Sequence, residues 1–260
     1  MKFRRQLFKY IDVNGALAML SKGTLQFTNS FYFNDPFDCH PSLIDFSSSP
    51  SRRYGPEFTN MIRETHMNKY DRLRERTWIC SLSKINDSLL MWSHYCWNHS
   101  GVCIGLDLDS LLETSPELFG TIYVKPLVFN VRYQDIIKRP DAYYTDEPPW
   151  YYQWRTKAKE WEYEQEVRLV MPNPSGMYAA FTPQQAKENK LDKTWDWKEI
   201  HQYMPLKGEC FDSIYFGINT DPKDKEKIIN HARKHLNPNI KLYQMTVDEN
   251  AFRLKATEIE

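Results

Sequence analysis

Four charged residues fall at every second position of the stretch WEYEQEVRLV (161–170), namely Glu162, Glu164, Glu166 and Arg168. Residues two apart share a face of a strand but diverge on a helix, so the spacing predicts one charged strand face. A carboxylate fixed at the rim of a water-poor cleft can stabilise positive charge developing on a sugar, or act as a general base. The alternative is a half-exposed strand whose charges form weak surface ion pairs.

Two further groups of polar residues could hold a ligand. Ser81 and Ser83, in the strand-like stretch TWICSLS, would place two hydroxyl groups on one strand face. The stretch FNDPFD carries Asn34, Asp35 and Asp38. Such side chains commonly bond the backbone of their own turn, but the same turn can also present them to a ligand or a metal ion.

Five residues in the middle of the chain are possible zinc ligands: Cys80, His94, Cys96, His99 and Cys103. Structural zinc sites usually place paired ligands across a tight turn, with a second pair at helical spacing. The spacing here differs, and Cys103 falls in the apolar stretch VCIGL, where cysteine behaves as a small hydrophobic residue. The sequence therefore predicts no metal at these residues.

Composition narrows the class of protein. The chain carries 34 basic and 34 acidic residues, so no net field favours nucleic acid or an anionic membrane. No apolar run has the length of a membrane span, the N-terminal residues lack the apolar stretch of a signal peptide, and five cysteines fit a reducing compartment. We therefore expect a cytoplasmic protein without a membrane partner.

The length of 260 residues predicts a single domain, 1–260, with a polar and irregular insertion at about 172–206. The sequence contains no glycine-rich dinucleotide or phosphate-binding loop, no HExxH and no GxSxG. Ordinary dinucleotide-binding, NTPase, zinc-protease and hydrolase assignments therefore have no support.

The elements that must position these residues are a mixture of strands and helices. Apolar alternation and turn signals predict strands at about 7–11, 24–29, 77–83, 101–109, 127–133 and 166–171, and helices at about 15–21, 57–76 and within 87–99. Gly23 is expected to end the first helix. The C-terminal part is expected to form strand, helix and strand, with Asp221 capping the helix and Pro222 in its first turn.

Three stretches resemble a large bacterial domain family of unknown function: LSKGTLQFTNSFYFNDPFD, CSLSKINDSLLMWSHYCWNHSGVCIGLDLD and KAKEWEYEQEVRLV. The shared features are the NDPFD turn, the LMWxHY helix and the ExExR strand. Some relatives of this family are associated with phage-defence and toxin-like genes. The resemblance thus implies a possible antitoxin or defence partner.

The order of the motifs also resembles that of ADP-ribosyltransferases, which place a basic or aromatic residue on the first strand, then an SxS motif, then a catalytic glutamate. The matching residues, in chain order, are Lys9, Tyr10, Ser81, Ser83, Glu164 and Glu166. The helix followed by KGTL is similar to the start of the DNA-modifying members. The resemblance implies an α+β fold with a mixed, mainly antiparallel split sheet and flanking helices.

The same resemblance implies roles for individual residues. Glu166 would hold the nicotinamide ribose and stabilise the oxocarbenium ion as nicotinamide leaves, with Glu164 as the other candidate for this role. Ser81 and Ser83 would support that geometry. Tyr10 or Tyr95 would stack on the nicotinamide. The remaining expected NAD-binding residues are Lys9, Asn34 and Asp35.

The resulting expectation is an enzyme that cleaves NAD, used as a substrate without a metal, and transfers ADP-ribose to a nucleic-acid or protein target. A second hypothesis is a metal-dependent nuclease. Its ligands would be Asp35, Asp38, Glu164 and Glu166, with Lys157 or Lys159 near the phosphate. A third is a non-catalytic module whose stretch YYQWRTKAKEW stacks bases and contacts phosphates.

Overall fold

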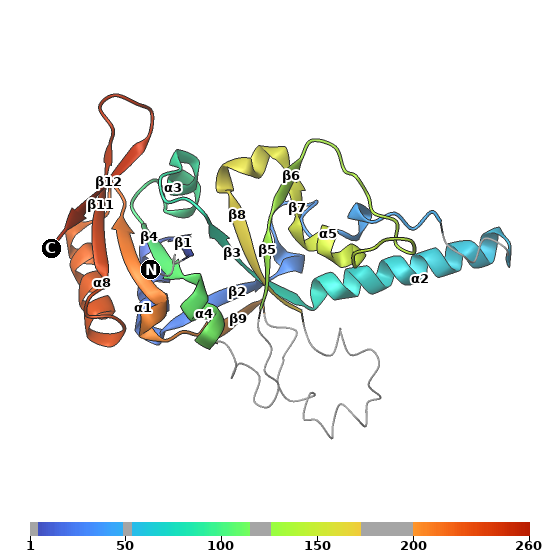
Figure 1. Ribbon diagram of the computed structural model, residues 1–260, viewed down its shortest axis with the longest axis horizontal. Helices are drawn as coiled ribbons and strands as arrows, with labels where there is room; N and C mark the ends of the chain where they lie inside the picture. Colours follow the sequence, from blue (N-terminus) through green and yellow to red (C-terminus); the bar gives the residue numbers. More distant parts are fainter. Residues whose placement is uncertain (1–4, 49–53, 115–125, 173–199) are drawn as a thin grey trace, which may run out of the picture.

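The structure is a computed structural model that describes residues 5–48, 54–114, 126–172 and 200–260 (Figure 1). Over these residues the chain forms a mixed α/β fold around an open sheet, and most neighbouring strands of this sheet run antiparallel. The predicted mixed fold with a mainly antiparallel sheet is confirmed. None of the helices in the described ranges combines the length and the apolar character needed to cross a membrane.

Ten strands form the sheet in the order β12-β11-β10-β4-β1-β3-β2-β9, and β8 pairs with both β3 and β5. The strands are β1 (Gln6–Ile11), β2 (Thr24–Asn29), β3 (Thr77–Ser83), β4 (Val102–Asp107), β5 (Leu127–Asn130), β8 (Glu166–Pro172), β9 (His201–Pro205), β10 (Phe211–Phe216), β11 (Lys241–Val247) and β12 (Leu254–Ile259). A separate parallel pair consists of β6 (Arg132–Gln134) and β7 (Thr156–Ala158).

Helices lie on both faces of the sheet, and α2 extends away from its end as a long arm (Figure 1). The α-helices are α1 (Val13–Lys22), α2 (Pro56–Glu75), α3 (Leu89–Tyr95), α4 (Leu108–Thr114), α5 (Pro149–Arg155) and α8 (Pro222–His235). Short 3₁₀ helices are η1 (Ser30–Tyr32), η2 (Pro41–Leu43), η5 (Lys159–Glu164) and η6 (Gly208–Cys210).

The capping residues predicted from sequence are confirmed. Gly23 follows α1 with φ +58°, a left-handed conformation that costs glycine little, so the helix ends there. The side chain of Asp221 accepts a hydrogen bond from the backbone N–H of Lys223, and Pro222 occupies the first turn of α8.

Several boundaries differ from the prediction. The strand predicted at 101–109 ends at Asp107, because residues 108–114 form α4. The strand predicted at 127–133 divides into β5 and β6. Most of the irregular segment predicted at 172–206 lies outside the described residues, but its last part, His201–Pro205, forms β9. This strand is short and lacks strict apolar alternation, so its structure depends on the ladder it forms with β2.

One face of the sheet is covered by α1 and α8 and contains the largest apolar cluster. Fully buried side chains from the strands, such as Phe27, Trp78 and Leu169, pack there against Leu20 of α1 and Ile228 of α8. Burial of such side chains is the main favourable term in folding, about 1.5–3 kcal/mol each. This face therefore holds the sheet together while the opposite face remains available for polar residues.

The opposite face carries two smaller apolar clusters. One includes Tyr10 and Trp92 and lies under α3, and the other includes Ile79 and Trp154 and lies under α5. Between these two clusters, β1 and β3 are paired at a single position, with Phe8 opposite Ser83. The two strands diverge beyond this position, which leaves an opening between the two halves of the sheet.

Candidate functional site

A pocket of about 340 Å³ lies where β1 and β3 separate. Eight of the nine predicted site residues line it: Lys9, Tyr10, Asn34, Ser81, Ser83, Tyr95, Glu164 and Glu166. The ninth, Asp35, does not. Its Oδ1 accepts a hydrogen bond from the backbone N–H of Phe37 at 2.9 Å, so Asp35 shapes the FNDPFD turn.

The prediction that Glu162, Glu164 and Glu166 follow one another along a strand is wrong. The first two lie in η5, and β8 begins only at Glu166. Gln165 has φ 42° and ψ 50°, a left-handed conformation that turns the chain and breaks the alternation. Glu162 is consequently exposed and pairs with Lys159 at 2.7 Å, whereas Glu164 and Glu166 are both buried and line the pocket.

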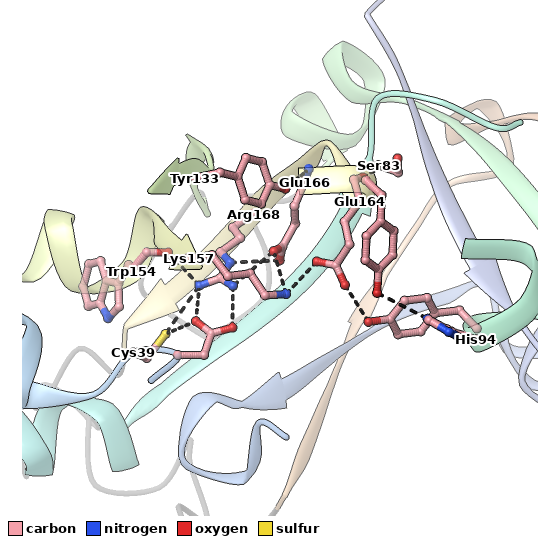
Figure 2. A network of polar contacts seen from close by, with 12 residues as sticks. Cys39, Ser83, His94, Tyr133, Trp154, Lys157, Glu164, Glu166 and Arg168 are labelled. Carbon is pink, nitrogen blue, oxygen red and sulfur yellow. Dashed lines mark hydrogen bonds and ion pairs between the residues drawn. The ribbon is translucent and has the colours of Figure 1, made fainter. Parts of the chain in front are cut away.

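Arg168 is fully buried and joins the FNDPFD turn to β8 (Figure 2). Its Nη1 and Nη2 donate to the two carboxylate oxygens of Asp38 at 2.7 and 2.6 Å. Its Nε and Nη2 donate to Glu166 at 2.8 and 3.1 Å. The alternative of a half-exposed strand with surface ion pairs is therefore wrong, because Glu166 and Arg168 form a buried network.

Glu164 is held from two sides (Figure 2). The hydroxyl of Tyr95 donates to its Oε1 at 2.6 Å, and Lys157 Nζ lies 2.6 Å from its Oε2. The same Nζ lies 3.5 Å from Glu166 Oε2 and 4.6 Å from the ring centroid of Trp161. Lys157 therefore links the two carboxylates of the pocket.

The surroundings shift the pKa values of the two carboxyl groups, Glu164 and Glu166, in opposite directions. Burial raises the pKa of Glu166, but the charges of Arg168 and Lys157 outweigh burial and lower this pKa to about 2. Burial also raises the pKa of Glu164, and there the charge of Lys157 does not compensate. Although burial lowers the pKa of Lys157, the nearby carboxylates raise it overall, so its ammonium form is kept. In a pair of carboxyl groups with one lowered and one raised pKa, the first group can stay ionised while the second accepts a proton.

Ser81, Ser83 and Lys9 fix the backbone around these carboxylates. Ser83 Oγ donates to the carbonyl oxygen of Glu164 at 2.7 Å. The nearby hydroxyl of Ser81 helps to lower the pKa of Glu166. Lys9 Nζ donates to the carbonyl oxygen of Ser81 at 3.1 Å. Ser83 thus holds the backbone at Glu164 in place, and Lys9 holds the backbone at Ser81.

The two tyrosines expected at the nicotinamide, Tyr10 and Tyr95, differ in their burial and their contacts. Tyr10 is buried, its hydroxyl donates to the carbonyl oxygen of Ile85 at 3.0 Å, and its ring meets Trp92 edge to face. Tyr95 is partly exposed, and its hydroxyl donates to Glu164 Oε1. Tyr10 therefore forms a fixed wall of the pocket, and Tyr95 stands at its side near solvent.

Several lining residues were not assigned to this site from the sequence. They are Phe8, Thr28, Tyr32, Phe33, Asp38, Leu82, Met91 and Lys157. Asp38 was predicted only as a possible ligand-holding residue of the FNDPFD turn or as a metal ligand, and Lys157 only within the nuclease and binding-module hypotheses. A usable signal for Asp38 is Arg168 itself, because an arginine in an apolar strand must find an acidic partner if the strand is buried.

The possible zinc ligands are not gathered in one place. Cys80 lies in the cluster under α1 and α8, Cys96 and Cys103 lie in the cluster under α3, and His94 Nδ1 lies 3.2 Å from the hydroxyl of Tyr163. In the described parts of the chain, no group of three or more histidine, cysteine, aspartate or glutamate side chains is arranged to hold a metal ion.

The residues of the two alternative hypotheses are engaged in other contacts. Asp35 lies outside the pocket, and Asp38 and Glu166 both face Arg168 rather than an open position for a metal. In the stretch YYQWRTKAKEW, Trp154 of α5 is buried, and Lys157 belongs to the carboxylate network. Neither arrangement favours a metal site or a nucleic-acid surface built from these residues.

Comparison with known proteins matches residues 91–169 to a family model described as a protein of unknown function (DUF2971). The matched segment runs from α3 to β8 and includes Tyr95, Lys157, Glu164, Glu166 and Arg168, whereas the FNDPFD turn lies outside it. No curated protein matches the chain, and no solved structure does.

Proposed function

We propose that the pocket binds NAD and that the protein is an ADP-ribosyltransferase-like enzyme, which transfers ADP-ribose to a nucleic-acid or protein target. One observation carries the proposal. Ser83 of β3 lies opposite Phe8 of β1 on one side and opposite Glu166 of β8 on the other. The three strands that bear the motifs, though far apart in the sequence, are therefore neighbours around one pocket.

The first chemical step is cleavage of the bond between the ribose C1′ and the nicotinamide nitrogen. Its electron pair leaves with nicotinamide, which departs as a neutral ring, and the ribose becomes an oxocarbenium cation. An ionised carboxylate fixed in a water-poor pocket stabilises this cation and lowers the barrier. Glu166 suits this role because its low pKa keeps it charged and Arg168 keeps it in place.

The second step is attack of the acceptor on C1′, during which the acceptor loses a proton. Glu164 suits the role of general base because burial raises its pKa towards the range in which a carboxylate takes up protons. Tyr95 and Lys157 fix its two oxygens. In this proposal Glu166 is the anion that stabilises the cation, and Glu164 is the base that takes the proton of the acceptor.

The direct test is incubation of the purified protein with NAD, with nicotinamide quantified by chromatography in the presence and absence of a chelator. We expect release of nicotinamide that a chelator does not reduce, because the proposed step uses only the protein's carboxylates. A cell extract supplies candidate acceptors in a parallel reaction. A folded protein that neither releases nicotinamide nor binds NAD by calorimetry would contradict the proposal.

Replacing Tyr95 with phenylalanine is expected to change the pH dependence of ADP-ribose transfer. The Tyr95 hydrogen bond lowers the pKa of Glu164, so its loss raises that pKa further. Because a general base must be ionised, the transfer rate falls as pH falls through the pKa of Glu164. In Tyr95→Phe this decline should begin at a higher pH, as measured by transfer of labelled ADP-ribose to an extract.

The matched control for this experiment is Tyr163→Phe. The hydroxyl of Tyr163 lies 3.2 Å from His94 Nδ1 in the same region, whereas the hydrogen bond to Glu164 Oε1 comes from Tyr95. This control variant should keep the wild-type pH profile. An unchanged profile in Tyr95→Phe, with transfer still measurable, would show that Glu164 is not the base.

A further inference from the structure

We propose that a single-stranded nucleic acid binds to the exposed face of β2 and β9, beside the pocket. We call the residues Gln26, Thr28, His201 and Tyr203 the β2/β9 face. This inference deepens the proposed function, since it chooses the class of acceptor. It rests on the geometry and chemistry of a surface that the catalytic proposal does not use.

The β2/β9 face is a continuous surface. The strands β2 and β9 lie side by side (Figure 1). In their antiparallel register, Gln26 lies opposite Tyr203 and Thr28 lies opposite His201. Residues directly opposite each other project from the same side of a sheet. The alternating residues Leu25, Phe27 and Met204 point the other way and are fully buried. On the β2/β9 face itself, Gln26 and Tyr203 are exposed and Thr28 and His201 are half-buried, above a well-packed base.

The surface leads directly into the pocket. Thr28 belongs to the β2/β9 face and also lines the pocket. It lies opposite Ile79 of β3, and Ser81, two residues further along β3, projects from the same side next to the pocket. A chain lying on the β2/β9 face would therefore have one end at the proposed reaction centre.

Aromatic rings stand at both ends of this path. Tyr203 is 53 % exposed, and Tyr32, in the 3₁₀ helix directly after β2, is 55 % exposed and lines the pocket. Exposed aromatic rings of this kind stack on nucleobases without regard to their identity. Lys22 Nζ lies 5.9 Å from the ring centroid of Tyr203, where an ammonium group can reach a phosphate beside a stacked base.

Polar side chains between the rings can bind base edges. His201 Nδ1 lies 3.1 Å from Gln26 Nε2 and 3.3 Å from Thr28 Oγ1, which fixes the imidazole in one orientation. Amide and imidazole groups are suited to the edges of unpaired bases.

The choice of nucleic acid over protein follows from charge and polarity. The stretches TLQFTN and HQYMP, which form the two strands, contain no acidic residue that would repel a phosphate backbone. Apart from Pro205, the outward side chains of the two strands are polar or aromatic, whereas protein interfaces have an apolar core.

The test is fluorescence anisotropy with end-labelled single-stranded DNA and RNA of mixed sequence and about 12 nucleotides, without NAD. Tyr203→Ala should weaken binding by about tenfold or more, because one stacked base is lost. Tyr203→Phe, which keeps the ring, should retain the wild-type affinity. Lys22→Gln should lower the slope of affinity against salt by about one phosphate contact.

The matched control is Tyr144→Ala, which removes an exposed ring (68 %) from the loop between β6 and α5 and should leave binding unchanged. The inference is overturned if neither oligonucleotide binds, if Tyr203→Ala binds as the wild type does, or if only peptides bind to this face. Since the assay contains no NAD, it can fail while nicotinamide release succeeds, and the reverse also holds. The two proposals can thus fail separately.

Discussion

Replacing Arg168 with methionine is expected to lower the free energy of unfolding by about 3–5 kcal/mol. The guanidinium group is fully buried and hydrogen-bonds to the carboxylates of both Asp38 and Glu166. Methionine has a similar length but no charge, so the two carboxylates would remain buried without their main partner. Urea denaturation followed by tryptophan fluorescence measures the change.

Arg5→Met is the matched control for Arg168→Met. Arg5 pairs with Asp109 at 2.6 Å, but 63 % of its side chain is exposed to solvent. Water screens such a pair, so the substitution should cost at most about 1 kcal/mol. A double-mutant cycle with Asp38→Asn provides a second check. Effects of Arg168→Met and Asp38→Asn that add to within about 0.5 kcal/mol would show that the pair is not coupled.

Replacing Glu166 with glutamine is expected to lower the rate of nicotinamide release by about 10²–10³-fold. The substitution keeps the shape of the side chain and removes the negative charge that is proposed to stabilise the oxocarbenium cation. NAD affinity, measured by calorimetry, should change much less than the rate, because the cation forms only during the reaction. Chromatographic detection of nicotinamide gives the rate.

The control for this substitution is Glu162→Gln, since Glu162 is two residues before Glu164 and is exposed. It should release nicotinamide at the wild-type rate. Because Glu166 is buried against Arg168, circular dichroism must show that Glu166→Gln is folded. As a second measurement, Glu164→Gln should reduce transfer to an acceptor more than it reduces nicotinamide release. A folded Glu166→Gln protein with the wild-type release rate would remove Glu166 from the mechanism.

Local signals in the sequence were sufficient for most helices and strands. Apolar runs, alternation and turn signals identified β1, β2 and β3, and the capping residues Gly23 and Asp221 act where predicted. These features depend on neighbouring residues only, because a capping side chain bonds the backbone within a few positions. The mixture of strands and helices followed from the same signals, whereas the mainly antiparallel sheet was implied by the resemblance to ADP-ribosyltransferases.

Local signals failed where tertiary contacts determined the backbone. The glutamates look evenly spaced along a strand, but Gln165 adopts a left-handed conformation and only Glu166 belongs to β8. The stretch HQYMP forms β9 because β2 supplies its hydrogen-bonding partner. A left-handed residue other than glycine and a short edge strand both depend on their surroundings, which composition does not encode.

The sequence by itself predicted the chemical groups of the site, among them two glutamates, two serines and two tyrosines, and the structure places them around one pocket. Only the tertiary structure determined that Arg168 bonds Asp38, 130 residues away, and that Lys157 bridges Glu164 and Glu166. The opposite pKa shifts of the two glutamates follow from these contacts. The physical reason is that burial and the distance between charges depend on the register of strands that are remote in the chain.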